Sequence, residues 1–399
     1  MDVTMIQHPV GQGGMFSGRL QKRNATLHWV YDCGSNQQDR LSEEILSVAA
    51  QGPIDLLFLS HLDSDHVNGV DRLLAATTVA EVVLPYLNAV DYAVAVIQEI
   101  EAGTLSGTFL EFVADPVKWL IGRGVSKVSL VRAGMHDKPL GEMLSDTEQK
   151  GPEDSAAEGF RYRWLPSAMK QRSLRDGVVQ EIETGGTASI YLDGRRVDWV
   201  LAPYVHAPTR RQMRYFIDEL RGALGSRLTR HAVVHLARSQ TGRALLKRCY
   251  RHFGCVHNKV SMALYSGPRQ PSVNRISQVL FDRLDIESYS DQREIGWLAT
   301  GDAELGTKTR LQALLYHYDG LRSRVGVLAL PHHGASNNFN PRLLDDLPRL
   351  HTCVAAAGRN RHGHPASSVA AAVTARLGAQ GWHHVCESNG SRFGIYAQL

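Results

Sequence analysis

The sequence predicts one large domain of layered α/β architecture. Apolar runs of strand length alternate with segments of helical periodicity, a pattern typical of sheets covered by helices. Clusters of histidine and aspartate come directly after several of these runs, at the strand ends where open α/β sheets hold their ligands. The 399 residues are 43% hydrophobic and 21% charged, which provides enough apolar material for a sizeable core.

In the first half, strands are expected at residues 3–7 and 27–31, on either side of a glycine-rich turn at 11–14. Residues 41–50 have the spacing of an amphipathic helix. The other elements expected before residue 202 are a strand at 55–59, a helix at 67–76, a strand at 79–84, helices at 89–102 and 116–121, and strands at 127–131, 160–164, 188–192 and 197–201. Those expected in the closing third are strands at 258–265, 296–300, 325–330, 351–357 and 393–397 and a helix at 366–377.

Two insertions are expected in this pattern, at about residues 86–159 and 207–257. The first ends in a stretch, 136–159, with seven acidic residues against two lysines, which predicts a surface loop. The second is helical by periodicity and basic. Eleven Lys or Arg lie between residues 210 and 251 against Asp218 and Glu219, a local excess of +9 in a chain whose net charge is +4.

Arginine-rich helices with interleaved aromatic residues suit a phosphate backbone and stacked bases. We therefore expect nucleic acid as a partner, contacted by Arg243, Lys247 and Arg248. A solvated face, or a contact with an acidic protein, is the alternative interpretation of the same charges.

The segment 55–69, DLLFLSHLDSDHVNG, is the centre of the predicted function. An apolar run is followed within a few residues by His61, Asp63, Asp65 and His66. Charges at the end of a buried strand must be exposed or neutralised, and a metal ion neutralises several of them at once. The alternative is a solvated loop that happens to be rich in histidine and aspartate.

This loop resembles the HxHxDH signature of the metallo-β-lactamase fold superfamily, with Asp63 in place of the middle histidine. The HxDxDH variant is most similar to the C-terminal metal-hydrolase domain of the competence DNA-uptake channel proteins. Other segments resemble the family's motifs and come in the family's order: 10–13 (VGQG), 258–264 (NKVSMAL), 300–304 (TGDAE), 331–334 (PHHG) and 363–365 (GHP). Gly14 stands where the family usually has an aspartate.

The resemblance implies an αββα sandwich that holds two divalent metal ions, Mn²⁺ or Zn²⁺, with Mg²⁺ as a further option. The implied ligands are His61 and Asp63 for one ion, Asp65 and His66 for the other, Asp302 as a bridge and His364 completing the second site. His206 is a weaker candidate for a third histidine at the first site. Asp63 replaces a nitrogen ligand with an oxygen, which favours Mn²⁺ or Mg²⁺, although Zn²⁺ outranks Mn²⁺ in raw affinity.

His332 and His333 are adjacent, so we do not expect both to face the same ion. One is expected to be a ligand while the other contacts a phosphate or donates a proton. The residues assigned to catalysis are Asp65 and His333, and those assigned to substrate binding near the centre are His332, Asn258 and Ser261.

Two metal ions can activate a water for in-line attack, and a phosphodiester makes the best use of two cations and a basic flank. The sequence therefore predicts a metal-dependent nuclease or phosphodiesterase. Two alternatives stay open, a metallohydrolase of small nucleotides or metabolites and a non-catalytic subunit of a bacterial defence complex. By analogy, a protein partner from a defence or DNA-processing operon, and an antiviral role, are expectations as well.

The five cysteines are odd in number and scattered, which predicts reduced thiols in a cytoplasmic protein. The first residues lack the basic and apolar regions of a signal peptide, and no apolar run approaches the ~20 residues that span a bilayer. We therefore expect a cytoplasmic protein without a membrane partner.

Overall fold

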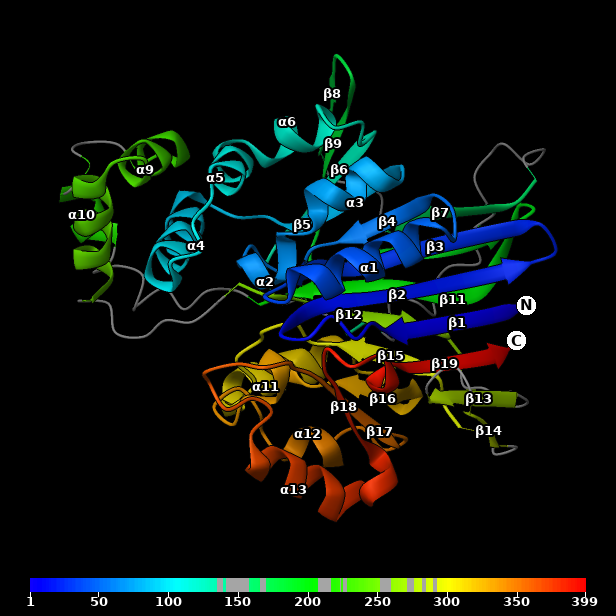
Figure 1. Ribbon diagram of the computed structural model, residues 1–399. Helices are drawn as coiled ribbons and strands as arrows, with labels where there is room; N and C mark the ends of the chain where they lie inside the picture. The colour runs from blue at the N-terminus through cyan, green and yellow to red at the C-terminus, as the bar shows by residue number, and fades with distance from the viewer. Residues whose placement is uncertain are drawn as a thin grey trace.

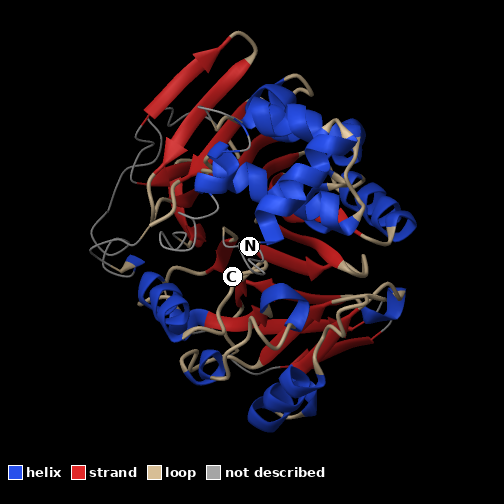
Figure 2. Cartoon of the chain, turned by 90° about the vertical axis from the view of Figure 1, so that its left-hand side faces the viewer, coloured by secondary structure: helices blue, strands red, loops and turns tan. Residues whose placement is uncertain are grey.

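The structure is a computed structural model that describes residues 1–134, 139–140, 158–165, 170–206, 217–222, 224, 228–251, 260–270, 276–281, 285–289 and 293–399. Two β-sheets lie face to face, with helices on both outer sides (Figure 1). The view turned by 90° shows the same layers, with helices above and below the strands (Figure 2). The predicted α/β sandwich, with the αββα layers that the resemblance implies, is confirmed.

The larger sheet contains both termini. Its strands, in spatial order, are β14 (Asp285–Tyr289), β13 (Ile276–Phe281), β19 (Phe393–Gln398), β1 (Asp2–Gln7), β2 (Gly13–Lys22), β3 (Ala25–Ser35), β4 (Ile54–Phe58), β5 (Val79–Pro85), β6 (Lys127–Val131), β9 (Gly177–Ile182) and β8 (Lys170–Leu174). The five strands from β3 to β9 in this order are parallel to one another.

The smaller sheet is built mainly from the second half of the chain. Its order is β18 (Trp382–Val385), β17 (Thr352–Ala356), β16 (Val325–Ala329), β15 (Gly296–Ala299), β12 (Met262–Gly267), β11 (Arg195–Val205), β10 (Thr187–Leu192) and β7 (Phe160–Leu165). Here β15 to β18 are the parallel strands.

Three groups of helices surround the sheets (Figure 1). The larger sheet is covered by α1 (Gln38–Ala49) and α3 (Val70–Ala76), with the short α2 (Ser64–Val67) beside them. The smaller sheet is covered by α11 (Lys308–His317), α12 (Arg342–Asp345) and α13 (Ser367–Leu377). A helical lobe at one end consists of α4 (Ala89–Ala102), α5 (Gly107–Ala114), α6 (Pro116–Ile121), α9 (Arg230–Ala237) and α10 (Gln240–Arg251).

Alternation along the central strands separates the two sides of the larger sheet. On β3, Trp29 and Tyr31 face the smaller sheet, whereas Val30 faces the helices. Between the sheets, the Trp29 ring lies 6.0 Å from that of Trp199, and Trp297 lies 4.6 Å from Phe16. These fully or almost fully buried aromatic rings fix the spacing of the two sheets, and with it the distance between their edges.

The sequence predicted most of these elements, and the clearest errors lie near the glycines. Residues 13–22 form strand β2, where only a turn at 11–14 was expected. Gly18 lies in that strand because a side chain there would enter the Trp29 ring. The helix expected at 67–76 is divided into α2 and α3, since the Gly69 amide donates to the Cys33 carbonyl at 2.9 Å and holds the chain against β3.

The two expected insertions meet in the structure, because α4 packs against both α9 and α10. Their exact boundaries stay predictions, and most of the expected acidic loop 136–159 lies outside the described residues. None of the described helices is long and apolar enough to cross a membrane.

Candidate metal centre

The carboxyl ends of three parallel strands deliver seven ionisable side chains to one place. They are His61, Asp63, Asp65 and His66 after β4, Asp302 after β15, and His332 and His333 after β16. Two sets of side chains have ligand atoms that all lie within 4.8 Å of one another inside the set. One set is His61, His66 and Asp302, and the other is Asp65, His66 and His333. The strand ends of both sheets therefore meet at this centre, as expected for an α/β layer.

The buried carboxylate of Asp302 lies in the middle and divides the centre into two halves. Its Oδ2 is 3.6 Å from Nε2 of His61 and 3.5 Å from Nε2 of His332. Its Oδ1 is 3.4 Å from Nε2 of His66 and 3.8 Å from Nε2 of His333. Each oxygen thus faces two imidazole nitrogens, which is the arrangement required of a carboxylate that bridges two ions.

Each half also contains an aspartate from the loop after β4. Asp63 Oδ2 lies 3.9 Å from Nε2 of His61. The Asp65 oxygens lie 3.8 Å from Nε2 of His66 and 3.5 Å from Nε2 of His333. Neighbouring ligands of a tetrahedral ion with bonds of about 2.1 Å are roughly 3.4 Å apart. The observed pairwise spacings, from 3.4 to 3.9 Å, are close to this value.

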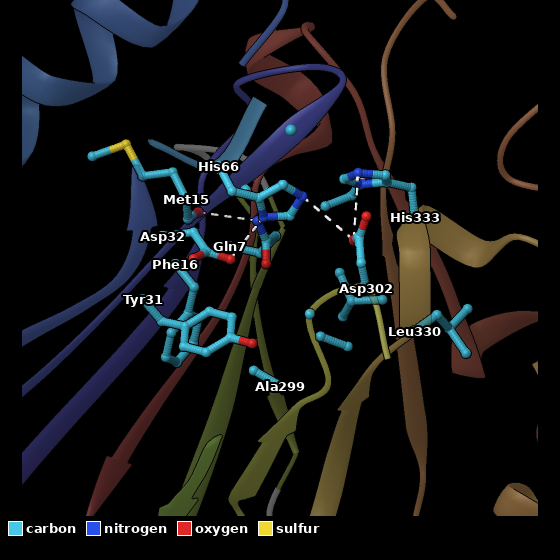
Figure 3. Close-up of a pocket in the computed structure, with 16 residues that line it drawn as sticks. Gln7, Met15, Phe16, Tyr31, Asp32, His66, Ala299, Asp302, Leu330 and His333 are labelled. Carbon is cyan, nitrogen blue, oxygen red and sulfur yellow. Dashed lines mark hydrogen bonds and ion pairs between the residues drawn. The ribbon is translucent and has the colours of Figure 1, made fainter. Parts of the chain in front are cut away.

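Asp32 orients two of the four imidazoles. Its Oδ2 accepts from Nδ1 of His66 at 2.8 Å (Figure 3) and from the Ser60 hydroxyl at 2.7 Å. Because that hydroxyl donates to Asp32, it accepts from Nδ1 of His61 at 2.8 Å. Both rings therefore carry their hydrogen on Nδ1 and direct the lone pair of Nε2 into the centre.

The other two imidazoles are oriented by acceptors on strand β17 and in the turn at residues 336–338. Nδ1 of His333 donates to the carbonyl of Ala356 at 2.7 Å, and Nδ1 of His332 donates to Oδ1 of Asn338 at 3.1 Å. The Asn338 amide donates in turn to the Asp302 carbonyl at 3.2 Å, which fixes its orientation. Positive φ angles of 48° and 58° at the two histidines turn both adjacent rings toward Asp302.

The centre has the unmatched polar atoms that a metal site leaves. Buried Nε2 atoms of His61, His66 and His333 and Oδ1 of Asp302 have no hydrogen-bond partner in the described part of the chain. Buried polar atoms without partners are costly, and lone pairs that face carboxylate oxygens repel one another. Cations between them remove both penalties, so the residues fit the two divalent ions that the sequence implies.

The electrostatics of the centre indicate the same need for cations. Burial raises the pKa of Asp65, but the His66 and His333 rings outweigh it and lower that pKa to about 2. Burial opposes charge on His66, yet Asp302, Asp32 and Asp65 hold its pKa well above the usual value. The pKa of His333 is raised too, because Asp302 and Asp65 outweigh burial. The Asp65 and Asp302 carboxylates therefore stay ionised near neutral pH and attract either protons or metal ions.

A cavity of about 40 Å³ lies between the sheets beside the centre (Figure 3). Its walls include Tyr31, Asp32, His66, Asp302 and His333. A volume of this size has room for a few water molecules but not for a nucleotide. A substrate must therefore reach the centre from the side of the surface loops.

The other histidines assigned to the metals lie apart from these two sets. The His364 ring is 5.2 Å from that of His332, and burial together with His332 and His333 lowers its pKa to about 4. The buried His206 packs against Tyr204, where burial and the positive charge of Arg310 lower its pKa to about 3. The surroundings of His206 disfavour a cation, so His332 is the better candidate for the second nitrogen ligand of the first site.

The residues assigned to substrate binding are spread over the molecule. Ser261 is buried and its hydroxyl accepts from the Asp302 amide at 3.0 Å, so it positions the bridging residue and is not exposed to a substrate. Asn258 lies outside the described residues. Arg243, Lys247 and Arg248 lie on α10 in the helical lobe.

Sequence reasoning missed Asp32 as a functional residue. It directly follows the strand expected at 27–31 and was assigned no role, although an acid at the end of an apolar run is itself a signal. Gly14 packs directly against it, and a side chain at Gly14 would come within 2.9 Å of His66 Nδ1 and 3.0 Å of Asp32 Cβ. The glycine therefore leaves space for the hydrogen bond between Asp32 and His66.

Comparison with curated proteins finds partial similarity to a ribonuclease. No protein-family model matches the chain. The chain is 26% identical over 204 residues to Ribonuclease BN of Escherichia coli O139:H28 (strain E24377A / ETEC), and equally to that of Shigella flexneri. The match covers 47% of this chain and 58% of each relative, so the chain spans little more than half the length of these relatives.

Solved structures with some similarity are metallo-β-lactamases. They are MEM-A1, a subclass B3 enzyme from a soil metagenome library, SMB-1 bound to 2-mercaptoethanesulfonate, and MIM-1 from Novosphingobium pentaromativorans. In the same order, their TM-scores are 0.26, 0.27 and 0.26, and their sequence identities are 9%, 9% and 13%. The matches cover 94%, 95% and 93% of this chain. They cover 93%, 96% and 89% of the matched chains. Scores of this size carry no argument about a common fold, and the description of this chain as an αββα sandwich rests on its own strand order and layers.

The raised pKa values of His66 and His333 predict how metal-free protein responds to pH. A raised pKa contributes stability that is complete below the unfolded value, about 6.5, and is lost as pH rises through the folded value. The unfolding temperature of chelator-treated protein should fall as pH rises above about 6.5. Added Mn²⁺ should raise it more at the higher pH, because protons then compete less for the imidazoles.

Thermal unfolding of His333→Asn, followed over the same pH range, provides the control. This variant should show a weaker pH dependence than the wild-type chain and a smaller response to Mn²⁺. Identical pH profiles for the two metal-free proteins would contradict the electrostatic description of the centre.

Proposed function

We propose that this chain is a metal-dependent hydrolase that cleaves phosphodiester bonds in nucleic acid. The observation that carries the proposal is the division of the Asp302 carboxylate between two pairs of imidazoles. A purely structural carboxylate would be matched by donors, whereas a bridge between two ions needs this geometry. The loop variant at 61–66 supports kinship with the metal-hydrolase domain of the competence DNA-uptake proteins.

The two halves would hold one ion each. The first half consists of His61, Asp63, His332 and Oδ2 of Asp302, and the second of His66, Asp65, His333 and Oδ1 of Asp302. Two divalent ions at this position supply positive charge and lower the pKa of a nearby water. With Asp32 included, the four positive charges of the ions balance the four carboxylates that point into or support the centre.

The protein's own residues keep this arrangement ready for an anionic substrate. Asp32, Ser60 and Asn338 hold the imidazoles in the tautomer that points Nε2 inward. The His332 side chain is 23% exposed, whereas those of His61 and His66 are 3% exposed. Among these rings, His332 is thus the one on the solvent-facing side of the centre, from which a phosphate would arrive.

The helical lobe supports nucleic acid as the substrate class. Arg238, Arg243 and Arg248 are exposed at α9 and α10, and α10 places Arg243 and Lys247 one turn apart on the same side. Such a charged helix can bind successive phosphates along a strand. The name of the partial relative, Ribonuclease BN, is consistent with this substrate class.

Asp302→Asn tests the two-metal proposal. The change keeps the shape of the side chain and removes the charge shared by both halves, so we expect cleavage to fall by roughly 10²-fold or more. Labelled single- and double-stranded DNA and RNA, incubated with Mn²⁺, Mg²⁺ or Zn²⁺, provide the measurement. Bound metal, counted by elemental analysis, should fall in parallel.

The matched control is Asp55→Asn, the same change at the start of β4, where the carboxylate accepts from the His28 amide at 2.8 Å. It should keep its metal and its activity. Wild-type cleavage of every substrate by Asp302→Asn would show that the two-metal proposal is wrong. Cleavage of small nucleotides only, by the wild-type chain, would favour the metabolite hydrolase instead.

The role of the basic lobe is tested by reversing two exposed charges, Arg243→Glu with Arg248→Glu. Lys247 is left in place because its Nζ lies 3.7 Å from Glu101 Oε1 on α4. Affinity for oligonucleotides should fall, and the salt dependence of log K should flatten by roughly 1.4–1.8 units per decade if both arginines contact phosphates. Fluorescence anisotropy over a salt series measures both.

Arg161→Glu with Arg163→Glu makes the same charge change on the edge strand β7, away from the lobe (Figure 1). That pair should change affinity and slope much less. Equal effects of the two double variants would mean that only net charge matters and that α10 is no specific contact.

The expected metal preference rests on the carboxylate oxygens that make up half of each proposed ligand set. Carboxylate oxygens suit Mn²⁺ better than a nitrogen-rich tetrahedral site does, while Zn²⁺ has the higher raw affinity. We expect Zn²⁺ to co-purify and Mn²⁺ to support the highest activity after complete metal removal. Asp63→His should shift the preference toward Zn²⁺. Activity with Zn²⁺ that equals or exceeds activity with Mn²⁺ in the unchanged chain would count against this assignment.

A further inference from the structure

The short helix α2 lies inside the metal loop and begins without a local cap. Asp63 occupies the N-cap position and Ser64 is the first helical residue. An N-cap aspartate usually accepts from an amide of the first turn, because those amides have no partner within the helix. Asp63 makes no such hydrogen bond, and its carboxylate is instead turned toward His61. The start of α2 therefore needs an acceptor from elsewhere in the chain.

The helical lobe supplies that acceptor. Glu99 on α4 is 3% exposed, and its Oε1 accepts from the Ser64 amide at 2.8 Å. Its Oε2 accepts from the Thr104 hydroxyl at 2.6 Å, which fixes the carboxylate just beyond the end of α4. Ser64 lies between Asp63 and Asp65, one assigned to each half of the centre. The hydrogen bond that the Ser64 amide donates to Glu99 thus holds the backbone between the two aspartates.

The same helix also carries the contacts of α9 and α10. Val96 of α4 and Val233 of α9 belong to the buried core of the lobe, and Lys247 of α10 is paired with Glu101, two residues from Glu99. Exposed ion pairs contribute little energy, so the rigid packing of α4 is the main connection. The surface proposed to bind nucleic acid and the backbone of the metal loop are therefore attached to one helix.

We propose that Glu99 is a positioning residue through which the helical lobe fixes the metal loop in its ligating geometry. The proposal rests on the proposed function only where cleavage is measured, because the effect of Glu99 on metal binding does not require a substrate. Residues that orient ligands without touching the metal typically change affinity or activity 10–100-fold when they are replaced.

Glu99→Met keeps the length of the side chain and removes both acceptor oxygens. We expect Mn²⁺ affinity, measured by calorimetry, to fall 10–100-fold. Hydrogen–deuterium exchange of the peptide that contains Ser64 should become faster, since its amide loses its acceptor. The kcat should fall with the metal affinity, whereas KM for nucleic acid should change little. Glu99→Gln retains one acceptor oxygen, so its Mn²⁺ affinity should stay within about threefold of the wild-type value. A small loss is expected because a neutral acceptor is weaker than a charged one.

Two further variants separate positioning from general stability. Thr104→Val removes the other hydrogen bond of Glu99 but leaves the acceptor of the Ser64 amide in place, so it should lower Mn²⁺ affinity and speed Ser64 exchange much less than Glu99→Met. Ser64→Pro removes the donor instead of the acceptor. Proline is tolerated at the first helical position, and Asp63, with φ −68° and ψ 146°, already has the conformation that a following proline requires. Its loss of Mn²⁺ affinity should match that of Glu99→Met and should not add to it in the double variant.

Wild-type Mn²⁺ affinity and wild-type Ser64 exchange in Glu99→Met would overturn the proposal. If Glu99→Met does not fold, full Mn²⁺ affinity in Ser64→Pro overturns it equally. An absence of cleavage in the wild-type chain would contradict the proposed function alone, because the metal and exchange measurements still decide the role of Glu99.

Discussion

The buried carboxylate of Asp302, facing four imidazole nitrogens without a matching donor at Oδ1 in the described part of the chain, is the constraint on which this structure depends. Burial alone does not distinguish it. Glu81 is also fully buried, but it accepts from Tyr162 and Trp164, each at 2.8 Å, and lies 2.6 Å from Nζ of Lys127. Glu81 is satisfied by protein donors and so belongs to the scaffold. Asp302 is satisfied only when the facing imidazoles are protonated or when metal ions lie between it and them, which makes it part of a site.

The sandwich places Asp302 among the four imidazoles because it joins two sheets at the carboxyl ends of their parallel strands. The loops after β4, β15 and β16 converge because the aromatic layer around Trp29 and Trp297 fixes how the sheets face each other. Hydrogen bonds then determine the direction of every ring nitrogen. Those donated to Asp32 and Ala356 are as important as the ligands, because an imidazole with its hydrogen on Nε2 could not bind an ion in this centre.

The sequence was most informative where the determinants are local. The helix expected at 89–102 coincides with α4, whose start has a capping box between Asn88 and Asp91 and whose end has Gly103 in the left-handed conformation. The metal loop was located because its histidines and aspartates follow an apolar run directly. The sequence could not show that His332 and not His206 lies beside Asp302, since that depends on a left-handed turn and on packing. Glycine-rich β2 was mistaken for a turn because the need for Gly18 arises from Trp29 on the next strand.

The residues that sequence reasoning overlooked share one property, which is that they act on the metal loop from a distance along the chain. A helix of four residues such as α2 has almost no stability of its own, because nucleation costs more than so few hydrogen bonds return. The loop must therefore be held from outside. Asp32 holds it from β3 through Ser60 and His66, and Glu99 holds it from α4 through Ser64. It follows that the backbone of the loop is held partly by the helical lobe, which contributes none of the seven ionisable side chains of the centre.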